Sequence, residues 1–343
     1  MKRIVLCISL SLLLVGVLAS CGKNSQKSDT YKPVIGLSLD SLVVERWRRD
    51  VDSFTRAASD LDATVKLRVA NQDADTQIAQ IKSLVDSGID VLVVIPNHAD
   101  KLTEVCRMVS RKHIPVISYD RLVNRANVDL YISFDNDRVG SLMANAALSA
   151  QATGNYVIIN GAITDNNAYM INRGFHQVLD PFIASGKINL VKEIWPSDWI
   201  SDEVKTRFEQ LLSEEKNIDV VLCGNDMLAE TVIGVLSENR MLGKTLVLGQ
   251  DAELSACQRV AEGSQYATIY KPIENLSLKA AALAVMLAKG EKLPAASTIY
   301  DGFYDVPYVK LEPILVTKEN LEATVIQDGF HTREDVFRNV PRR

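Results

Sequence analysis

Histidine is scarce in this chain of 343 residues, and its spacing does not indicate a metal site. Zinc-binding helices often carry two histidines four residues apart, so that both side chains lie on one face. No such pair occurs among the four histidines, which are His98, His113, His176 and His331. We therefore expect no zinc centre in this protein.

Cysteine is also rare, and the cysteines that follow Cys21 do not resemble a disulfide framework. There are three of them, each in an apolar stretch and without C-x-x-C spacing: Cys106, Cys223 and Cys257. Because three is an odd number, they cannot all pair within the chain. We expect buried thiols instead.

Positive charge is not concentrated anywhere along the chain, whose formal net charge is −5. A nucleic-acid-binding domain would show a basic patch or stripe, so nucleic acid is not an expected partner. The chain also lacks a G-x-x-x-x-G-K-[ST] phosphate loop, a G-x-G-x-x-G turn after the first predicted strand, and a G-x-S-x-G elbow. These absences give no support to nucleotide binding or to an α/β-hydrolase.

The N-terminus contains the apolar run IVLCISLSLLLVGVL, preceded by two basic residues and followed by small ones. This pattern is typical of a secretory signal peptide over residues 1–20, and the run is too short to be interpreted first as a spanning helix. Leu18–Cys21 resembles a lipobox, in which cleavage precedes a cysteine that receives lipid; an ordinary signal with an incidental cysteine is the alternative. Residues 21–32 add a polar tether. We expect an exported protein anchored through lipid at Cys21, in the periplasm or on the outer face of the cell membrane.

Beyond the tether, short apolar runs alternate with amphipathic stretches of helical period. The predicted strands form two series, 33–39, 64–70, 90–96 and 115–120, followed by 155–161, 188–196, 219–225 and 245–251. DVLVVIP is apolar almost throughout, as expected for a parallel strand that is covered on both faces. This alternation predicts an α/β protein with parallel sheets and right-handed crossovers.

The two series resemble each other, which places polar residues at equivalent strand ends. IDVLVVIPN, a helix and PVISYDR in the first half match IDVVLCGND, a helix and TLVLGQDA in the second. Asp120 and Asp251 then occupy equivalent positions at the carboxyl ends of strands, where open α/β sheets bind ligands. A surface ion pair between Asp120 and Arg121 is the simpler alternative, and it would contribute under ~1 kcal/mol. Two cleft carboxylates could also serve a glycosidase, but their amide or basic neighbours favour recognition of hydroxyl groups.

A set of motifs is spread in one order between residues 33 and 337: ERW (45–47), QIxxIKSLVDSGIDVLVVIP, SYDR (118–121), DLYISFDND, DNNA (165–168), WPSDW (195–199), GNDMLAE, GQDAEL, TIYKPI and VIQDGFH. These motifs resemble those of the class I periplasmic sugar-binding proteins of ABC transporters, especially those that bind D-xylose. The resemblance implies the type I periplasmic binding protein fold, with two Rossmann-like lobes of parallel strands joined by a three-stranded hinge. It divides the chain into an N-terminal lobe of residues 33–134 and 272–303 and a C-terminal lobe of residues 135–271 and 304–337.

Carried over motif by motif, the resemblance implies eight contacts to a sugar. They are Arg46 of ERW, Asp120 and Arg121 of SYDR, Asn167 of DNNA, Trp199 of WPSDW, Asn225 of GND, Asp251 of GQDA and Lys271 of YKP. Carboxylate, amide and guanidinium groups match hydroxyls that both donate and accept hydrogen bonds. An indole can cover the apolar face of a pyranose ring.

Some of these residues could have a structural role instead of contacting a sugar. Arg46 could form a salt bridge near the first helix, and Trp195 competes with Trp199 as the aromatic platform. Asp165 is a candidate N-cap for the helix after DNNA, with a weak case as a ligand contact.

The chain also departs from the family pattern near the expected cleft. Asn97 and His98 stand at the rim of this cleft. At position 172, where the family usually has a basic residue, this chain has an asparagine, and its basic residue is Arg173, one place further along the helix. These changes leave the exact sugar open.

The resemblance implies a receptor that is not an enzyme and needs no cofactor or metal. Its ligand would be a monosaccharide, with D-xylose favoured, and its partner the membrane permease of an ABC importer. Arabinose, glucose or galactose remain alternative ligands. A sensor subunit that signals to a membrane kinase or chemoreceptor would have the same site.

Overall fold

The computed structural model describes residues 31–340, with the exception of residues 44, 200, 295 and 296. The predicted signal peptide and the predicted lipid-bearing Cys21 lie outside the described residues. Pro33–Arg343 form one compact unit. In the described part of the chain, every helix is too short or too polar to cross a membrane.

The first lobe is built on a seven-stranded sheet in the order β11-β12-β5-β4-β3-β1-β2. Its strands are β1 (Val34–Leu39), β2 (Thr64–Val69), β3 (Val91–Ile95), β4 (Val116–Tyr119), β5 (Leu130–Phe134), β11 (Ser297–Tyr300) and β12 (Asp305–Leu311). The strands are parallel except β11, which pairs antiparallel with β12 at the edge. The carboxyl ends of β1, β3, β4 and β5 therefore point the same way.

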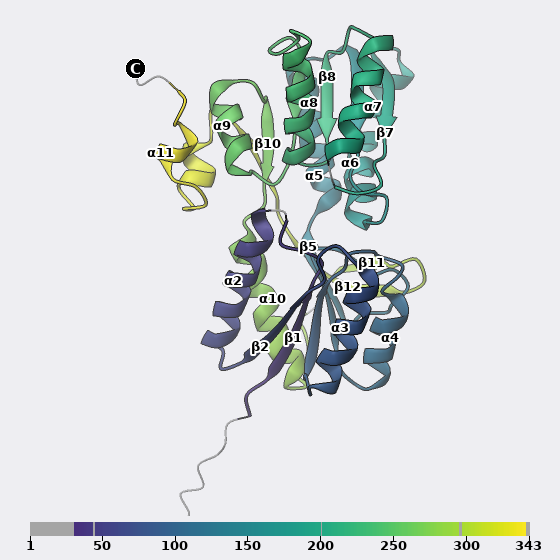
Figure 1. The fold of residues 1–343 in the computed structure, drawn as a ribbon, viewed down its shortest axis with the longest axis vertical. Coiled ribbons are helices and arrows are strands. Elements are labelled where there is room, and N and C mark those ends of the chain that lie inside the picture. Colours follow the sequence, from purple (N-terminus) through teal and green to yellow (C-terminus); the bar gives the residue numbers. More distant parts are fainter. Residues whose placement is uncertain (1–30, 44, 200, 295–296, 341–343) are drawn as a thin grey trace, which may run out of the picture. The chain divides into compact units, whose positions relative to one another are not determined.

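Helices cover both faces of this sheet. On one face lie α2 (Glu45–Asp60) and α10 (Ile273–Ala288), and on the other lie α3 (Ala74–Asp86) and α4 (Thr103–Arg111) (Figure 1). All five residues of β3, VLVVI, are buried, because this central strand has helices above and below it.

The second lobe has a six-stranded sheet in the order β13-β10-β9-β8-β6-β7, parallel except for β13. Its strands are β6 (Gly154–Ile159), β7 (Ile188–Ile194), β8 (Val220–Cys223), β9 (Leu246–Leu248), β10 (Ala267–Tyr270) and β13 (Ile314–Thr317). The predicted α/β fold with two lobes of mainly parallel strands is confirmed.

Helices cover the second sheet in the same manner. One face packs against α5 (Asn136–Ala150) and α6 (Asn166–Ala184), and the other against α7 (Ser201–Glu214) and α8 (Asp226–Glu238). A smaller apolar cluster joins β10 and β13 to α9 (Leu254–Glu262), a π-helix (Glu322–Ile326) and α11 (Arg333–Val336). The three cysteines beyond Cys21 are buried, as the sequence predicted.

Within the residues that the structure describes, the chain crosses between the two sheets three times. It passes from β5 to α5 at Asp135, from β10 to α10 at Lys271–Pro272, and from β12 to β13 at Glu312–Pro313. The predicted third boundary, between residues 303 and 304, is wrong, because β12 belongs to the first sheet and pairs with β5. Gly302 (φ +96°) lies in the turn between β11 and β12. The sequence signal there marks a hairpin turn and not a hinge.

Candidate functional site

The eight residues that the sequence analysis singled out all line one cavity, whose empty space of about 350 Å³ includes open solvent. Its lining comes from both lobes and consists of Arg46, Trp47, Asp120, Arg121, Asp165, Asn167, Trp199, Asn225, Gln250, Asp251 and Lys271.

Asp120 and Asp251 enter the cavity from equivalent points of the two sheets, just beyond β4 and β9. Both have a left-handed backbone, with φ of +61° at Asp120 and +96° at Asp251. Each also donates its backbone N–H to the neighbouring strand, to the carbonyl oxygens of Ile132 and Ile269 respectively, at 2.8 Å in both cases. Left-handed conformations are uncommon outside glycine and cluster at functional sites. The strained turns aim both carboxylates at the cavity.

Arg46, from the first turn of α2, lies among three carboxylates. Its Nη2 is 2.8 Å from Asp120 Oδ1, its Nε is 3.2 Å from Asp50 Oδ2, and its Nη1 is 3.6 Å from Asp251 Oδ1. The last of these contacts joins the two lobes. Burial by itself would raise the pKa of Asp120, but the cations Arg46, Lys271 and Arg121 outweigh it and hold this pKa below its ordinary value. The site therefore keeps Asp120 ionised.

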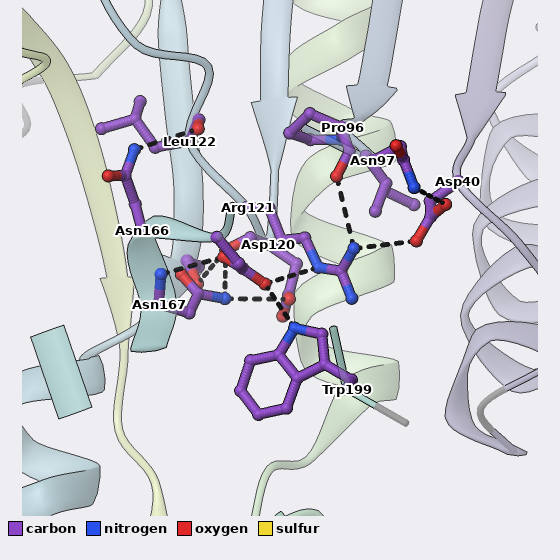
Figure 2. Close-up of polar contacts among 12 residues, drawn as sticks. Asp40, Pro96, Asn97, Asp120, Arg121, Leu122, Asn166, Asn167 and Trp199 are labelled. Atoms are coloured by element: carbon purple, nitrogen blue, oxygen red, sulfur yellow. Dashed lines mark hydrogen bonds and ion pairs between the residues drawn. The ribbon is translucent and has the colours of Figure 1, made fainter. Parts of the chain in front are cut away.

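A surface ion pair between Asp120 and Arg121 is ruled out by their burial, with exposed fractions of 3% and 8%. Arg121 pairs elsewhere: its Nη1 donates to Asp40 Oδ2 at 2.9 Å and to the Pro96 carbonyl at 3.3 Å (Figure 2). Asn97, a rim residue in the sequence analysis, donates from Nδ2 to Asp40 Oδ1 at 2.8 Å. Asn97 thus supports Arg121 indirectly and does not line the cavity.

Two asparagines line the cavity; the side-chain amide of Asn167 donates hydrogen bonds within the protein, and that of Asn225 accepts one. Asn167 donates to the backbone oxygen of Asp120 at 3.1 Å and to its Oδ2 at 3.3 Å (Figure 2). Asn225 is the N-cap of α8, and its Oδ1 accepts from the Leu228 N–H at 2.9 Å. The N–H groups of the Asn225 amide are the part that can bond a ligand.

Trp199, rather than Trp195, is the tryptophan of WPSDW that reaches the cavity. Its indole lies against Gly161, just beyond β6, so closely that a Cβ at Gly161 would be 2.0 Å from the ring. Trp195 instead stacks on Tyr169, with ring centroids 4.9 Å apart. Glycine at position 161 is what makes room for the Trp199 ring.

Trp47 and Gln250 line the cavity although the sequence analysis did not select them. Both are sequence neighbours of selected residues, Trp47 next to Arg46 in ERW and Gln250 next to Asp251 in GQD. Trp47 Nε1 and Gln250 Oε1 are buried and have no hydrogen-bond partner among the described residues. Asp251 Oδ1 has cations nearby, with Lys271 Nζ at 3.2 Å, but no hydrogen bond of regular geometry. Buried polar groups without partners are unfavourable, so these atoms are available for hydrogen bonds to a polar ligand or to water.

The sequence pattern of the periplasmic binding protein domain family matches residues 35–292. The chain belongs to this family. It is 41% identical over 327 residues to the D-xylose-binding periplasmic protein of Haemophilus influenzae, covering 95% of this chain and 98% of that protein. It is 39% identical to the D-xylose-binding periplasmic protein of Escherichia coli, covering 98% and 99% respectively.

A solved structure shares the fold of this periplasmic binding protein. It is the carbohydrate transporter solute binding protein from Chloroflexus aurantiacus in complex with D-glucose, with a TM-score of 0.82 and 25% identity. The match covers 89% of this chain and 98% of that one.

The departures from the family pattern on α6 lie outside the cavity lining of this periplasmic binding protein. Asn172 donates to Glu193 Oε2 at 2.9 Å and to Asn160 Oδ1 at 3.1 Å, and Arg173 pairs with Asp137 at 2.6 Å. Neither side chain contacts the ligand space. Within the described residues, no group of three or more His, Cys, Asp or Glu side chains is placed to hold a metal ion.

Proposed function

We propose that this periplasmic binding protein captures a single monosaccharide, with D-xylose favoured, and delivers it to the permease of an ABC importer. The observation that carries the proposal is the cavity that both lobes line at the carboxyl ends of their strands. Its lining combines carboxylate acceptors, cationic donors and two indoles with buried polar atoms that have no partner in the described protein.

The chemistry of this lining matches a pyranose. Each sugar hydroxyl both donates and accepts hydrogen bonds, so Asp120 and Asp251 can accept from hydroxyls to which Arg46 and Lys271 donate. Bonds to charged groups are the stronger kind. The indole of Trp199 offers the apolar surface that the C–H face of the ring requires.

D-xylose is favoured over other sugars by the comparisons. The two relatives at 41% and 39% identity are both D-xylose-binding proteins, and each match spans nearly the whole chain. Xylose lacks the hydroxymethyl group that glucose carries at C5.

The site is suited to binding without catalysis. A glycosidase needs one carboxylic acid whose pKa is raised so that it can protonate a leaving group. In this cavity the cations lower the pKa of Asp120, and Asp251 lies beside Lys271 and Arg46. Burial raises the pKa of a third carboxyl, Asp165, but its side chain already contacts Arg121, Trp199 and the Asn167 N–H. Both Asp120 and Asp251 are arranged to accept hydrogen bonds.

Xylose is expected to bind at least ~10-fold more tightly than glucose, a difference of ~1.4 kcal/mol. A pocket closed over a pentopyranose rejects the additional hydroxymethyl group by overlap. Calorimetric titration of soluble protein that begins after Cys21, with xylose, glucose, arabinose and galactose, measures this difference. Glucose binding as tight as xylose binding would overturn the xylose assignment, and no binding of any of the four sugars would overturn the receptor function.

Export and anchoring complete the proposal, with lipid on Cys21 holding the receptor at a membrane through residues 21–32. We expect Cys21→Ser to release the protein into the soluble fraction and to leave its xylose affinity unchanged, because the anchor lies outside the sugar-binding unit. Cell fractionation followed by titration tests both parts. Cys7→Ser is the matched control and should remain at the membrane. A membrane-bound Cys21→Ser protein would refute lipid anchoring at this residue.

A further inference from the structure

The side chain of Asp165 contacts residues from both lobes. It is the N-cap of α6, where its Oδ1 accepts the backbone N–H of Asn167 at 2.9 Å. This bond confirms the N-cap role expected from the sequence. It uses one carboxylate oxygen and leaves Oδ2 for other partners.

The second oxygen forms an ion pair with one side chain and a hydrogen bond with another, and these two side chains belong to different lobes. Asp165 Oδ2 lies 2.8 Å from Arg121 Nε and accepts the indole N–H of Trp199 at 3.1 Å. Arg121 and Trp199 are drawn close together in Figure 2. The Asp165 side chain is only 2% exposed, so these bonds are shielded from water.

Arg121 reaches Asp165 from a fixed position in the first lobe. Asp40 and the Pro96 carbonyl both hold its Nη1, which leaves Nε directed at the second lobe. The contact therefore crosses from one lobe to the other. A buried carboxylate is stabilised by such a cation, so the pair favours the conformation in which the lobes meet.

The Trp199 side chain contacts Gly161 as well as Asp165. One part of the indole lies against Gly161, where an added Cβ would be 2.0 Å from the ring. The indole has a single polar atom, Nε1, and Asp165 accepts its hydrogen. This bond sets the orientation of the ring in its own plane.

We propose that Asp165 is a positioning residue that orients the Trp199 indole over the cavity and, through Arg121, couples that orientation to closure of the two lobes. The inference deepens the proposed function and rests on it, since the indole is taken there as the platform for a sugar.

Asp165→Asn is the sharpest variant, because it keeps the size of the side chain and an oxygen for the N-cap. Its amide N–H groups would then face the Arg121 and Trp199 donors, and both bonds would be lost. We expect xylose affinity to fall roughly 10- to 100-fold by calorimetry. Asp73→Asn is the matched control, an exposed N-cap on α3 whose Oδ1 accepts from the Thr76 N–H at 2.6 Å. It should bind xylose like the wild type.

Fluorine NMR of protein labelled with 5-fluorotryptophan tests the orientation without any sugar. The chain has three tryptophans, so each resonance can be assigned by a single Trp→Phe substitution. We expect Asp165→Asn to shift or broaden the Trp199 resonance while that of Trp195 stays in place. Asp73→Asn should move neither resonance.

A double-mutant cycle separates positioning from a general structural effect. In a Trp199→Phe background the indole N–H is absent, so Asp165→Asn should reduce xylose affinity by a smaller factor than in the wild type. An equal reduction in both backgrounds, or an unshifted Trp199 resonance, would overturn the inference. Failure of the wild type to bind any sugar would instead refute the proposed function, while the NMR experiment would still decide the role of Asp165.

Discussion

Replacement of Arg46 by methionine is expected to lower the free energy of unfolding by about 3–5 kcal/mol and to weaken xylose binding more than ~100-fold. Arg46 contacts Asp50, Asp120 and Asp251 together. Methionine retains much of the apolar stem but leaves these carboxylates in a buried site without the guanidinium. Removal of one partner from a buried ion-pair network has a large cost, because the remaining charges are uncompensated.

The destabilisation of Arg46→Met should depend on pH in a defined direction. In the wild type, burial raises the pKa of Asp50 to about 6 although Arg46 opposes the rise. Without Arg46 this pKa rises further, so the folded chain holds a proton that the unfolded chain releases above the ordinary value of 3.8. The free energy of unfolding of the variant then falls as pH rises from the pKa of Asp50 in the unfolded chain to its raised pKa in the folded chain. The loss should be smaller at about pH 5 than at about pH 8.

Urea denaturation at the two pH values, with calorimetric titration of xylose, measures these effects. Arg48→Met is the matched control, since Arg48 lies in the same helix but is exposed. It should change the free energy of unfolding by less than ~0.5 kcal/mol and leave affinity unchanged. A stable Arg46→Met protein with normal affinity would show that the carboxylates do not depend on this guanidinium.

Asp251→Asn is expected to weaken xylose binding roughly 10- to 100-fold, because a hydrogen bond to a charged group contributes ~1.5–3 kcal/mol. Asp251 Oδ1 is buried beside Lys271 Nζ at 3.2 Å and has no hydrogen bond of regular geometry in the described protein. A sugar hydroxyl would supply it. Asparagine keeps the size of the side chain and tolerates the left-handed backbone, so the strained turn is preserved.

Titration with xylose, together with a separate measurement of unfolding, distinguishes lost affinity from lost stability. Asp62→Asn is a suitable control, because Asp62 also has a positive φ, of +58°, but is exposed and does not line the cavity. Its affinity should equal that of the wild type. An Asp251→Asn protein that binds xylose normally would remove Asp251 from the proposed site.

The ion pairs of the site illustrate what could not be predicted from neighbouring residues. Asp120 and Arg121 are adjacent in the sequence, which suggested a pair between them. Asp120 has a positive φ, of +61°, and the two side chains have different partners. Asp120 instead pairs with Arg46, and Arg121 pairs with Asp40 and Asp165. Such partners lie far apart along the chain, so pairing depends on how the sheet and helices pack.

The position of the third crossing between the lobes also could not be predicted from neighbouring residues alone. Gly302 is a turn signal, and a turn can end a lobe or join two strands of a hairpin. The choice depends on whether the next strand can pair with β5, and β12 does so from Tyr308 to Leu311. Strand pairing is a non-local interaction, so the local signal was ambiguous.

The sequence by itself determined the alternation of strands and helices and the polar residues at the strand ends. These features follow from local rules: β3 is apolar throughout because both its faces are covered, and Asp120 and Asp251 follow strands that end at equivalent edges. Tertiary structure alone decided that Trp47 and Gln250 also line the cavity, and that Asp165 bonds both Arg121 and Trp199. These contacts join segments from different strands and different lobes, and only packing of the whole chain brings them within hydrogen-bonding distance.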